Sequence, residues 1–304
     1  MSERRRSGAL LGIGGEEGLP YSKGLMARAL IAAGVAAVRA YELAQRIELD
    51  LAGGGDATAT FERLDELAAE VLGTEAGKRA IGRLRRYRRL QELDLPLILL
   101  IGGATGTGKS TVATEVAWRL GITRVTSTDF VRQTMRAFFS DEFMPSIHYS
   151  SFEAGAALRA PDEAVDAAVA GFLEQTRNVL VGVRAALERA LQEGWSMVLE
   201  GVHLVPGLIP PPIEGAMVVQ CVLAIEDEEE HRTHFAVRDA GTDGARSADK
   251  YIRGFPEIRR IQDAIVARAH RANVPVIENG NVEEAIGSVM ELVLEGAETL
   301  EVKP

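Results

Sequence analysis

Residues 97–110 read LILLIGGATGTGKS, and they carry the strongest structural signal in the chain. The uninterrupted apolar run at 97–101 is typical of a strand buried on both faces of a sheet. Glycines end this strand, and a helix is predicted from Lys109 to Leu120. Residues 103–110 therefore match G-x-x-x-x-G-K-[ST] between a strand and a helix, which is the context that a phosphate-binding loop (P-loop) requires.

Each residue type in this loop has a chemical reason. Glycine lets backbone N–H groups turn toward a phosphate where a Cβ would block the approach, and the following helix N-terminus favours an anion. Lys109 is predicted to contact the β- and γ-phosphates of ATP, and the Ser110 hydroxyl to ligate Mg2+. The predicted nucleotide site comprises Gly103, Ala104, Thr105, Gly106, Thr107, Gly108, Lys109, Ser110 and Thr111.

Strands and helices alternate after this loop. Further strands are predicted at 124–126, 197–199, 217–225 and 274–277, and helices from about 129 and over 161–192, 227–240, 255–272 and 281–296. This alternation predicts an α/β fold, a doubly wound parallel sheet of the P-loop NTPase type. Residues 1–93 are predicted to be helical and to end in an arginine-rich segment at 78–89. We expect a small helical domain over 1–93 and a P-loop domain over 94–304.

The composition fits a folded protein of two domains. The chain has 304 residues, of which 46% are hydrophobic and 26% charged. Its net charge of −10 argues against nucleic acid as the main partner. The sequence contains no apolar run near the ~18 residues of a membrane helix, and its single cysteine excludes a disulfide framework. We expect a cytoplasmic protein without a membrane partner. Formation of a homo-oligomer is an open alternative.

Two carboxylates follow predicted strands, where an open α/β sheet binds its ligands. Asp129 comes after the strand at 124–126 and is predicted to accept the proton of an acceptor hydroxyl, although it could also cap a helix. Glu200 directly follows the strand at 197–199 and resembles the carboxylate of a Walker B strand, which holds Mg2+ through water. Glu200 could instead bind the acceptor.

Cationic side chains near Asp129 indicate an anionic acceptor. Arg132 and Arg136 lie three and seven residues further on, on the same helical face, and guanidinium groups match carboxylate and phosphate. The other predicted acceptor-binding residues are His148, Ser150, Ser151 and His203. Residues 148–153 could instead form an ordinary polar loop, and His203 could have a structural role.

A hinged lid is predicted around Gly241 and Gly244. Its arginines would close over the transferring phosphate, although each of them could be a surface residue. The predicted lid residues are Arg238, Arg246 and Arg253. A phosphate loop, strand-end carboxylates and a cationic lid together favour a small-molecule kinase over a switch or a motor.

Five stretches of the chain resemble the 2-phosphoglycerate kinase family: GGATGTGKSTVATEVAWRLGI, TRVTSTDFVRQTMR, IHYSSFEAG, MVLEGVHLVPG and YIRGFPEIRRIQDAIV with the VPVIEN that follows. The resemblance covers most of residues 95–280. It implies ATP-dependent phosphorylation of the 3-hydroxyl of 2-phosphoglycerate to 2,3-bisphosphoglycerate, with magnesium. Two alternatives stay open, a kinase for another small acidic or hydroxylated acceptor and a nucleotide-sensing regulatory protein.

The segment from Leu19 to Gln45 resembles the ATP-cone, a small helical nucleotide-binding regulatory domain. Members of the kinase family can carry such a domain before the catalytic domain. The resemblance implies regulation by nucleotide; a helical docking domain without a ligand is the alternative.

Overall fold

The computed structural model describes residues 21–54, 60–158, 166–209, 214–240 and 248–301, which form two compact units. One unit contains the described residues up to Asp94 together with those from Met290 onward, and the other runs from Leu95 to Val289. The sequence placed residues 290–304 in the P-loop domain. The described part of this segment clusters instead with the first unit, where Glu291 and Glu298 form ion pairs with Arg86.

The first unit is helical. Ser22 and Thr60 cap two of its helices, because their side-chain oxygens accept hydrogen bonds from backbone N–H groups of the first turn. These N–H groups have no partner within the helix. Apolar side chains such as Leu30, Leu43 and Leu67 are fully buried between the helices. The helices before Asp94 are α1 (Lys23–Ala32), α2 (Ala37–Gly54), α3 (Phe61–Leu72) and α4 (Thr74–Glu92).

The second unit alternates strands and helices. Its elements are β1 (Leu97–Gly103), α5 (Lys109–Leu120), β2 (Val125–Ser127), α6 (Thr128–Phe138), the 3-10 helices η2 (Pro145–His148) and η3 (Ala154–Ala157), α7 (Ala167–Gln192), β3 (Met197–Glu200), β4 (Met217–Ala224), α8 (Glu228–Ala240), α9 (Ala248–Arg253), α10 (Phe255–Arg271), β5 (Val276–Glu278) and α11 (Val282–Glu301), the last of which continues into the first unit.

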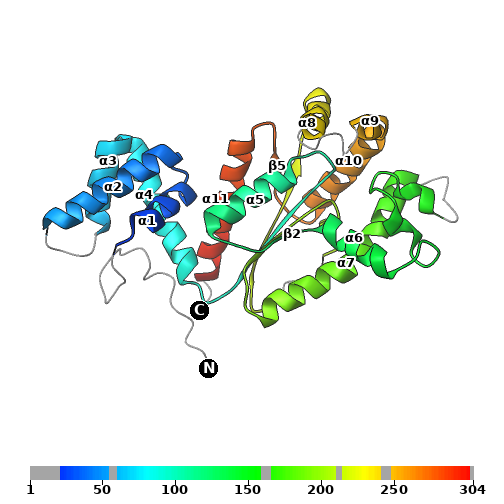
Figure 1. Cartoon of the computed structure of the whole chain (residues 1–304), viewed down its shortest axis with the longest axis horizontal. Coiled ribbons are helices and arrows are strands. Elements are labelled where there is room, and N and C mark those ends of the chain that lie inside the picture. The colour runs from blue at the N-terminus through cyan, green and yellow to red at the C-terminus, as the bar shows by residue number, and fades with distance from the viewer. Residues whose placement is uncertain (1–20, 55–59, 159–165, 210–213, 241–247, 302–304) are drawn as a thin grey trace. The chain divides into compact units, whose positions relative to one another are not determined.

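These strands form one parallel sheet of order β2-β3-β1-β4-β5 among the described residues. Strand β1 lies in the middle and is buried along its whole length. Ile98 and Leu100 pack against Val179 of α7 on one face, while α5 and α11 lie on the other (Figure 1). The five predicted strands and the α/β fold are confirmed.

All five strands point the same way, so their carboxyl ends meet at one edge of the sheet. The phosphate loop follows β1 at this edge, Asp129 follows β2, and Glu200 ends β3. Over the described part of the chain, no helix has the length and apolar composition to cross a bilayer.

Candidate active site

The phosphate loop has the backbone that its sequence predicts. Gly103, Gly106 and Gly108 have φ angles of 141°, 89° and 74°, which other residues rarely adopt. A Cβ on Gly103 would lie 2.3 Å from the carbonyl oxygen of Leu223, so this position also lacks the space for one. Successive glycines of this kind let backbone N–H groups turn toward a bound anion.

Lys109 begins α5 and is almost completely buried. Its ammonium donates hydrogen bonds to the Ala104 carbonyl at 2.5 Å and to the Thr107 hydroxyl at 3.5 Å, both within the loop. Burial lowers the pKa of Lys109 to about 8, whereas the negative charge of Glu200 acts to raise it. A cation that is partly stripped of water is well suited to bind a polyanion.

Helix α8 holds the outer side of this loop. A ring N–H of His231 donates to the Thr105 carbonyl at 2.9 Å, and one of His234 donates to the Gly106 carbonyl at 3.0 Å. Burial and neighbouring cations lower the pKa of His231 to about 4, so the ring is neutral near pH 7. Both carbonyls are thereby fixed facing α8.

Asn279, directly after β5, holds the loop from a third element. Its amide donates to the Thr107 carbonyl at 2.9 Å, and the side chain is buried. A Cβ on Gly108 would lie 2.3 Å from the Asn279 amide nitrogen. The glycine therefore permits this contact as well as the turn.

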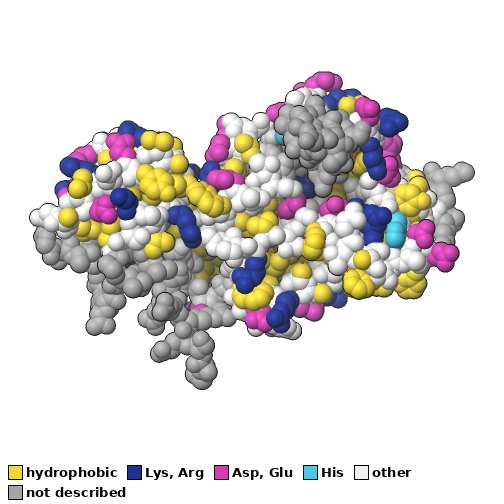
Figure 2. All heavy atoms as spheres, viewed as in Figure 1, with side chains coloured by type: hydrophobic (Ala, Val, Ile, Leu, Met, Phe, Trp, Pro, Cys, Tyr) yellow, Lys and Arg dark blue, Asp and Glu magenta, His cyan; other side chains and the backbone are white. Residues whose placement is uncertain are grey.

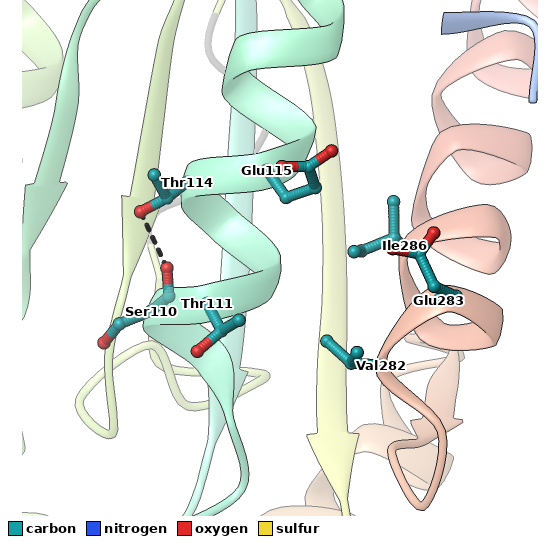
Figure 3. A pocket seen from close by; sticks show the side chains of 7 residues that line it. All are labelled: Ser110, Thr111, Thr114, Glu115, Val282, Glu283 and Ile286. Atoms are coloured by element: carbon teal, nitrogen blue, oxygen red, sulfur yellow. Dashed lines mark hydrogen bonds between the residues drawn. The ribbon is translucent and has the colours of Figure 1, made fainter. Parts of the chain in front are cut away.

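Ser110 and Glu200 meet beside the loop. The Ser110 hydroxyl donates to Oε1 of Glu200 at 3.0 Å, and Glu200 is buried. A cavity of about 540 Å³ begins at this first turn of α5. Figure 3 shows its α5 side chains facing those of α11, and the lining residues are Ser110, Thr111, Thr114, Glu115, Val282, Glu283 and Ile286.

Asp129 and Arg132 form an ion pair on the first turns of α6. Nε and a terminal nitrogen of Arg132 donate to the same Asp129 oxygen at 3.0 and 2.8 Å. Arg132 is buried and also donates to the carbonyls of Ile147 and Tyr149, whereas 53% of the Asp129 side chain is exposed. Arg132 thus orients the solvent-exposed Asp129 carboxylate. The hydrogen bonds of Arg132 itself all go to protein atoms.

Residues 145–151 connect this pair to the phosphate loop, and we call them the acceptor loop after the acceptor contacts that the sequence predicts there. The hydroxyls of Ser151 and Thr105 lie 3.3 Å apart, and Ser151 is buried. His148 contacts the Phe139 carbonyl through a ring nitrogen at 3.0 Å, while Ser150 is half-buried. The structure brings Ser151 to the phosphate loop and gives His148 a contact on α6's C-terminal side.

His203 lies under the acceptor loop and is 1% exposed. Its Nδ1 lies 2.9 Å from the Thr128 hydroxyl and its Nε2 lies 3.0 Å from the Gln175 side-chain oxygen. Burial, followed by the positive charge of Arg132, lowers the pKa of His203 to about 3. Both ring nitrogens have protein partners, so the ring supports the loop in this structure.

The remaining predicted residues are more dispersed. Arg136 is exposed and donates to Gln133 at 3.0 Å, and Arg253 is exposed on α9. The side chain of Arg238 and the whole of Arg246 lie outside the described residues. The ion pair between Lys250 of α9 and Glu153, at 2.8 Å, joins the segment before α10 to the residues after the acceptor loop.

Four residues of this site were not predicted from the sequence: His231, His234, Asn279 and Gln175. Asn279 directly follows a predicted strand, and this position at the carboxyl edge was an available signal. The histidines lie inside the helix predicted over 227–240, where no local pattern distinguishes them. Gln175 lies inside a long amphipathic helix, where no local pattern distinguishes it.

Charges are mixed on the molecular face that Figure 2 shows. Lysine and arginine side chains alternate with aspartate and glutamate over short distances among the side chains coloured there.

Comparison with known proteins gives close relatives over nearly the whole chain. The chain is 37% identical over 276 residues to the 2-phosphoglycerate kinase of Methanopyrus kandleri, which covers 90% of this chain and 84% of the relative. It is 41% identical over 273 residues to that of Methanothermobacter thermautotrophicus (89% of each chain) and 37% identical over 281 residues to that of Pyrococcus furiosus (92% and 91%).

Other comparisons add little. No protein-family model matches the chain. A shikimate kinase from Bacteroides thetaiotaomicron aligns with 68% of this chain and 99% of its own length, at a TM-score of 0.35 and 16% identity.

Proposed function

The chain belongs to the 2-phosphoglycerate kinase family, and on that premise we propose that it transfers the γ-phosphoryl group of ATP to the 3-hydroxyl of 2-phosphoglycerate. The product is 2,3-bisphosphoglycerate. The observation that carries the proposal is the identity of 37–41% to these three relatives over about nine tenths of the chain. The grouping of Lys109, Glu200 and Asp129 at one sheet edge supports it.

The phosphate loop and the neighbouring cavity fit ATP. The glycine positions leave a cradle of backbone N–H groups, and Lys109 supplies a desolvated positive charge. The cavity beside Ser110 and Thr111 combines the apolar side chains of Val282 and Ile286 with polar groups. This lining suits a nucleoside, whose base is apolar on its faces and polar at its edges.

Ser110 and Glu200 fit Mg2+ as a pair of hard oxygen donors. The Ser110 hydroxyl oxygen and Oε1 of Glu200 lie 3.0 Å apart. Mg2+ is usually bound by one or two protein oxygens together with water and substrate phosphates. Bound there, Mg2+ would neutralise charge on the β- and γ-phosphates. Glu200 would orient the Ser110 hydroxyl toward the ion.

Asp129 would prepare the acceptor. Its exposed carboxylate can accept a hydrogen bond from the 3-hydroxyl and take up the proton as the new P–O bond forms. Arg132 fixes the orientation of this carboxylate. The anionic groups of the acceptor would contact Arg136, His148 and the serines of the acceptor loop, and the lid arginines would approach the transferring phosphoryl group.

An acceptor screen tests this function. Purified protein with Mg·ATP is offered 2-phosphoglycerate, 3-phosphoglycerate and glycerate, and ADP formation is followed by a coupled assay. We expect rapid turnover with 2-phosphoglycerate alone, with 2,3-bisphosphoglycerate identified as the product by 31P NMR. Faster turnover of another acceptor would overturn the substrate, and ATP binding without any turnover would favour a regulatory protein.

A further inference from the structure

Gln175 is a buried polar residue in the N-terminal half of α7, whose other buried positions are largely apolar. Its side-chain nitrogen donates to the Ser146 carbonyl at 2.6 Å and to the Tyr149 carbonyl at 3.1 Å. Carbonyl oxygens only accept hydrogen bonds, so the amide has one orientation. The side-chain oxygen of Gln175 must then face His203.

This orientation determines the direction of the next two hydrogen bonds. Nε2 of His203 carries the proton and donates to Gln175, because the amide oxygen can only accept. Nδ1 of His203 is then the acceptor for the hydroxyl of Thr128, the residue before Asp129. The low pKa of His203 agrees with a neutral ring in this tautomer.

These hydrogen bonds form a closed network. The Tyr149 carbonyl accepts from Gln175 and also from Arg132, which holds Asp129. The backbone of the acceptor loop is therefore attached to the start of α6 by two routes, one through His203 and one through Arg132. Both routes are buried, so water competes little with either.

We infer that Gln175 is a positioning residue, which sets the acceptor loop against Asp129 and so governs acceptor recognition. This inference rests on the proposed function. Gln175 makes its described hydrogen bonds away from the phosphate loop, to Ser146, Tyr149 and His203. Its loss should therefore affect the acceptor and spare the nucleotide.

The adjacent residue supplies a matched control. Thr176 is also fully buried on α7, and its hydroxyl has no hydrogen-bond partner among the described residues. Thr176→Val removes a buried polar group of that helix without removing a described hydrogen bond. Gln175→Met removes three hydrogen bonds at nearly constant volume.

The kinetic test compares these two variants. For Gln175→Met we expect kcat/KM for 2-phosphoglycerate to fall about 100-fold, because a small displacement of a reacting group has an effect of that size. The dissociation constant of Mg·ATP, measured by calorimetry, should change less than about twofold, a change equivalent to under 0.5 kcal/mol. Thr176→Val should have the same kcat/KM and the same Mg·ATP dissociation constant as the unchanged protein. Equal losses of acceptor and nucleotide affinity, or unchanged acceptor kinetics, would overturn the inference.

Gln175→Glu adds a readout that a purely structural role would not change. A carboxylate at this position faces two carbonyl oxygens, whereas a protonated carboxyl group can donate to one of them. We expect kcat/KM of this variant to recover toward low pH, relative to the unchanged protein. A pH profile parallel to that of the unchanged protein would contradict the assigned hydrogen bonds.

Hydrogen exchange separates this inference from the proposed function, because it needs no substrate. Peptides covering residues 144–153 should exchange faster in Gln175→Met than in Thr176→Val, while peptides covering 103–111 remain alike. If the loop responds in this way but 2-phosphoglycerate is not phosphorylated, the substrate is wrong and the positioning role stands. Unchanged exchange in the loop would contradict the positioning role itself.

Discussion

Ser110 and Glu200 are 90 residues apart in the chain and share a hydrogen bond of 3.0 Å. The contact exists because β3 lies beside β1, with Glu200 opposite Ile101 in the parallel register. The sheet thus places the strand-end carboxylate beside the first turn of the helix that follows the phosphate loop. The proposed magnesium site depends on this pairing.

The first prediction concerns Glu200→Gln. The amide oxygen can still accept from Ser110, so the unfolding temperature should stay within about 2 °C, a shift corresponding to about 1 kcal/mol. The loss of negative charge should weaken the apparent affinity for Mg2+ about 10- to 100-fold. A magnesium titration of the initial rate measures this. Glu188→Gln, on the exposed side of α7, is the control, and equal magnesium dependence in both variants would refute the site.

The second prediction concerns Lys109→Met. Because Lys109 is buried with a lowered pKa, its charge does not stabilise the fold, and methionine retains the apolar stem. We expect an unchanged or slightly higher unfolding temperature together with a fall in kcat of at least about 100-fold. Turnover and thermal unfolding are measured on the same preparation. Retained turnover would exclude the assigned role of the loop lysine.

A third prediction concerns Asn279. Asn279→Ala leaves the buried Thr107 carbonyl without this donor, which should cost about 1–3 kcal/mol and weaken ATP binding about 5- to 150-fold if the loop shifts. Asn279→Asp should bind ATP more weakly still, because a carboxylate would face the carbonyl. Calorimetry gives both constants. Asn178→Ala, which loses a contact with Ser146, serves as the control and should bind ATP normally.

The sequence predicted the sheet well because its strongest signals are local. Strand β1 is buried at each position, so its apolar run is uninterrupted and easily recognised. The 3-10 helices at Pro145–His148 and Ala154–Ala157 and the six-residue α9 were not predicted. Such segments are too short to show a hydrophobic period.

In the site, too, the residues with a local sequence signal were predicted and the others were not. The phosphate loop is one continuous motif, and Asp129 and Glu200 follow strands that the sequence reveals. The supporting residues come from distant segments: Asn279 contacts Thr107 across 172 positions, and His231 contacts Thr105 across 126. The sequence also assigned Arg132 and His203 to the substrate, whereas the structure gives their polar atoms protein partners. These partners depend on tertiary packing, which local spacing does not encode.

The last prediction concerns the pH dependence of stability. Burial lowers the pKa of His203 from 6.5 to about 3, so below pH 6.5 the unfolded chain binds a proton at this residue that the folded protein does not. The free energy of unfolding should therefore decrease as the pH falls from about 6.5 toward 3. The contribution of one such histidine approaches about 1.4 kcal/mol for each pH unit. His203→Gln removes the titrating group and retains hydrogen-bonding capacity, so its stability should fall less steeply. Urea unfolding at pH 7, 6, 5 and 4.5 measures both slopes, and parallel slopes would show that His203 is protonated in the folded protein.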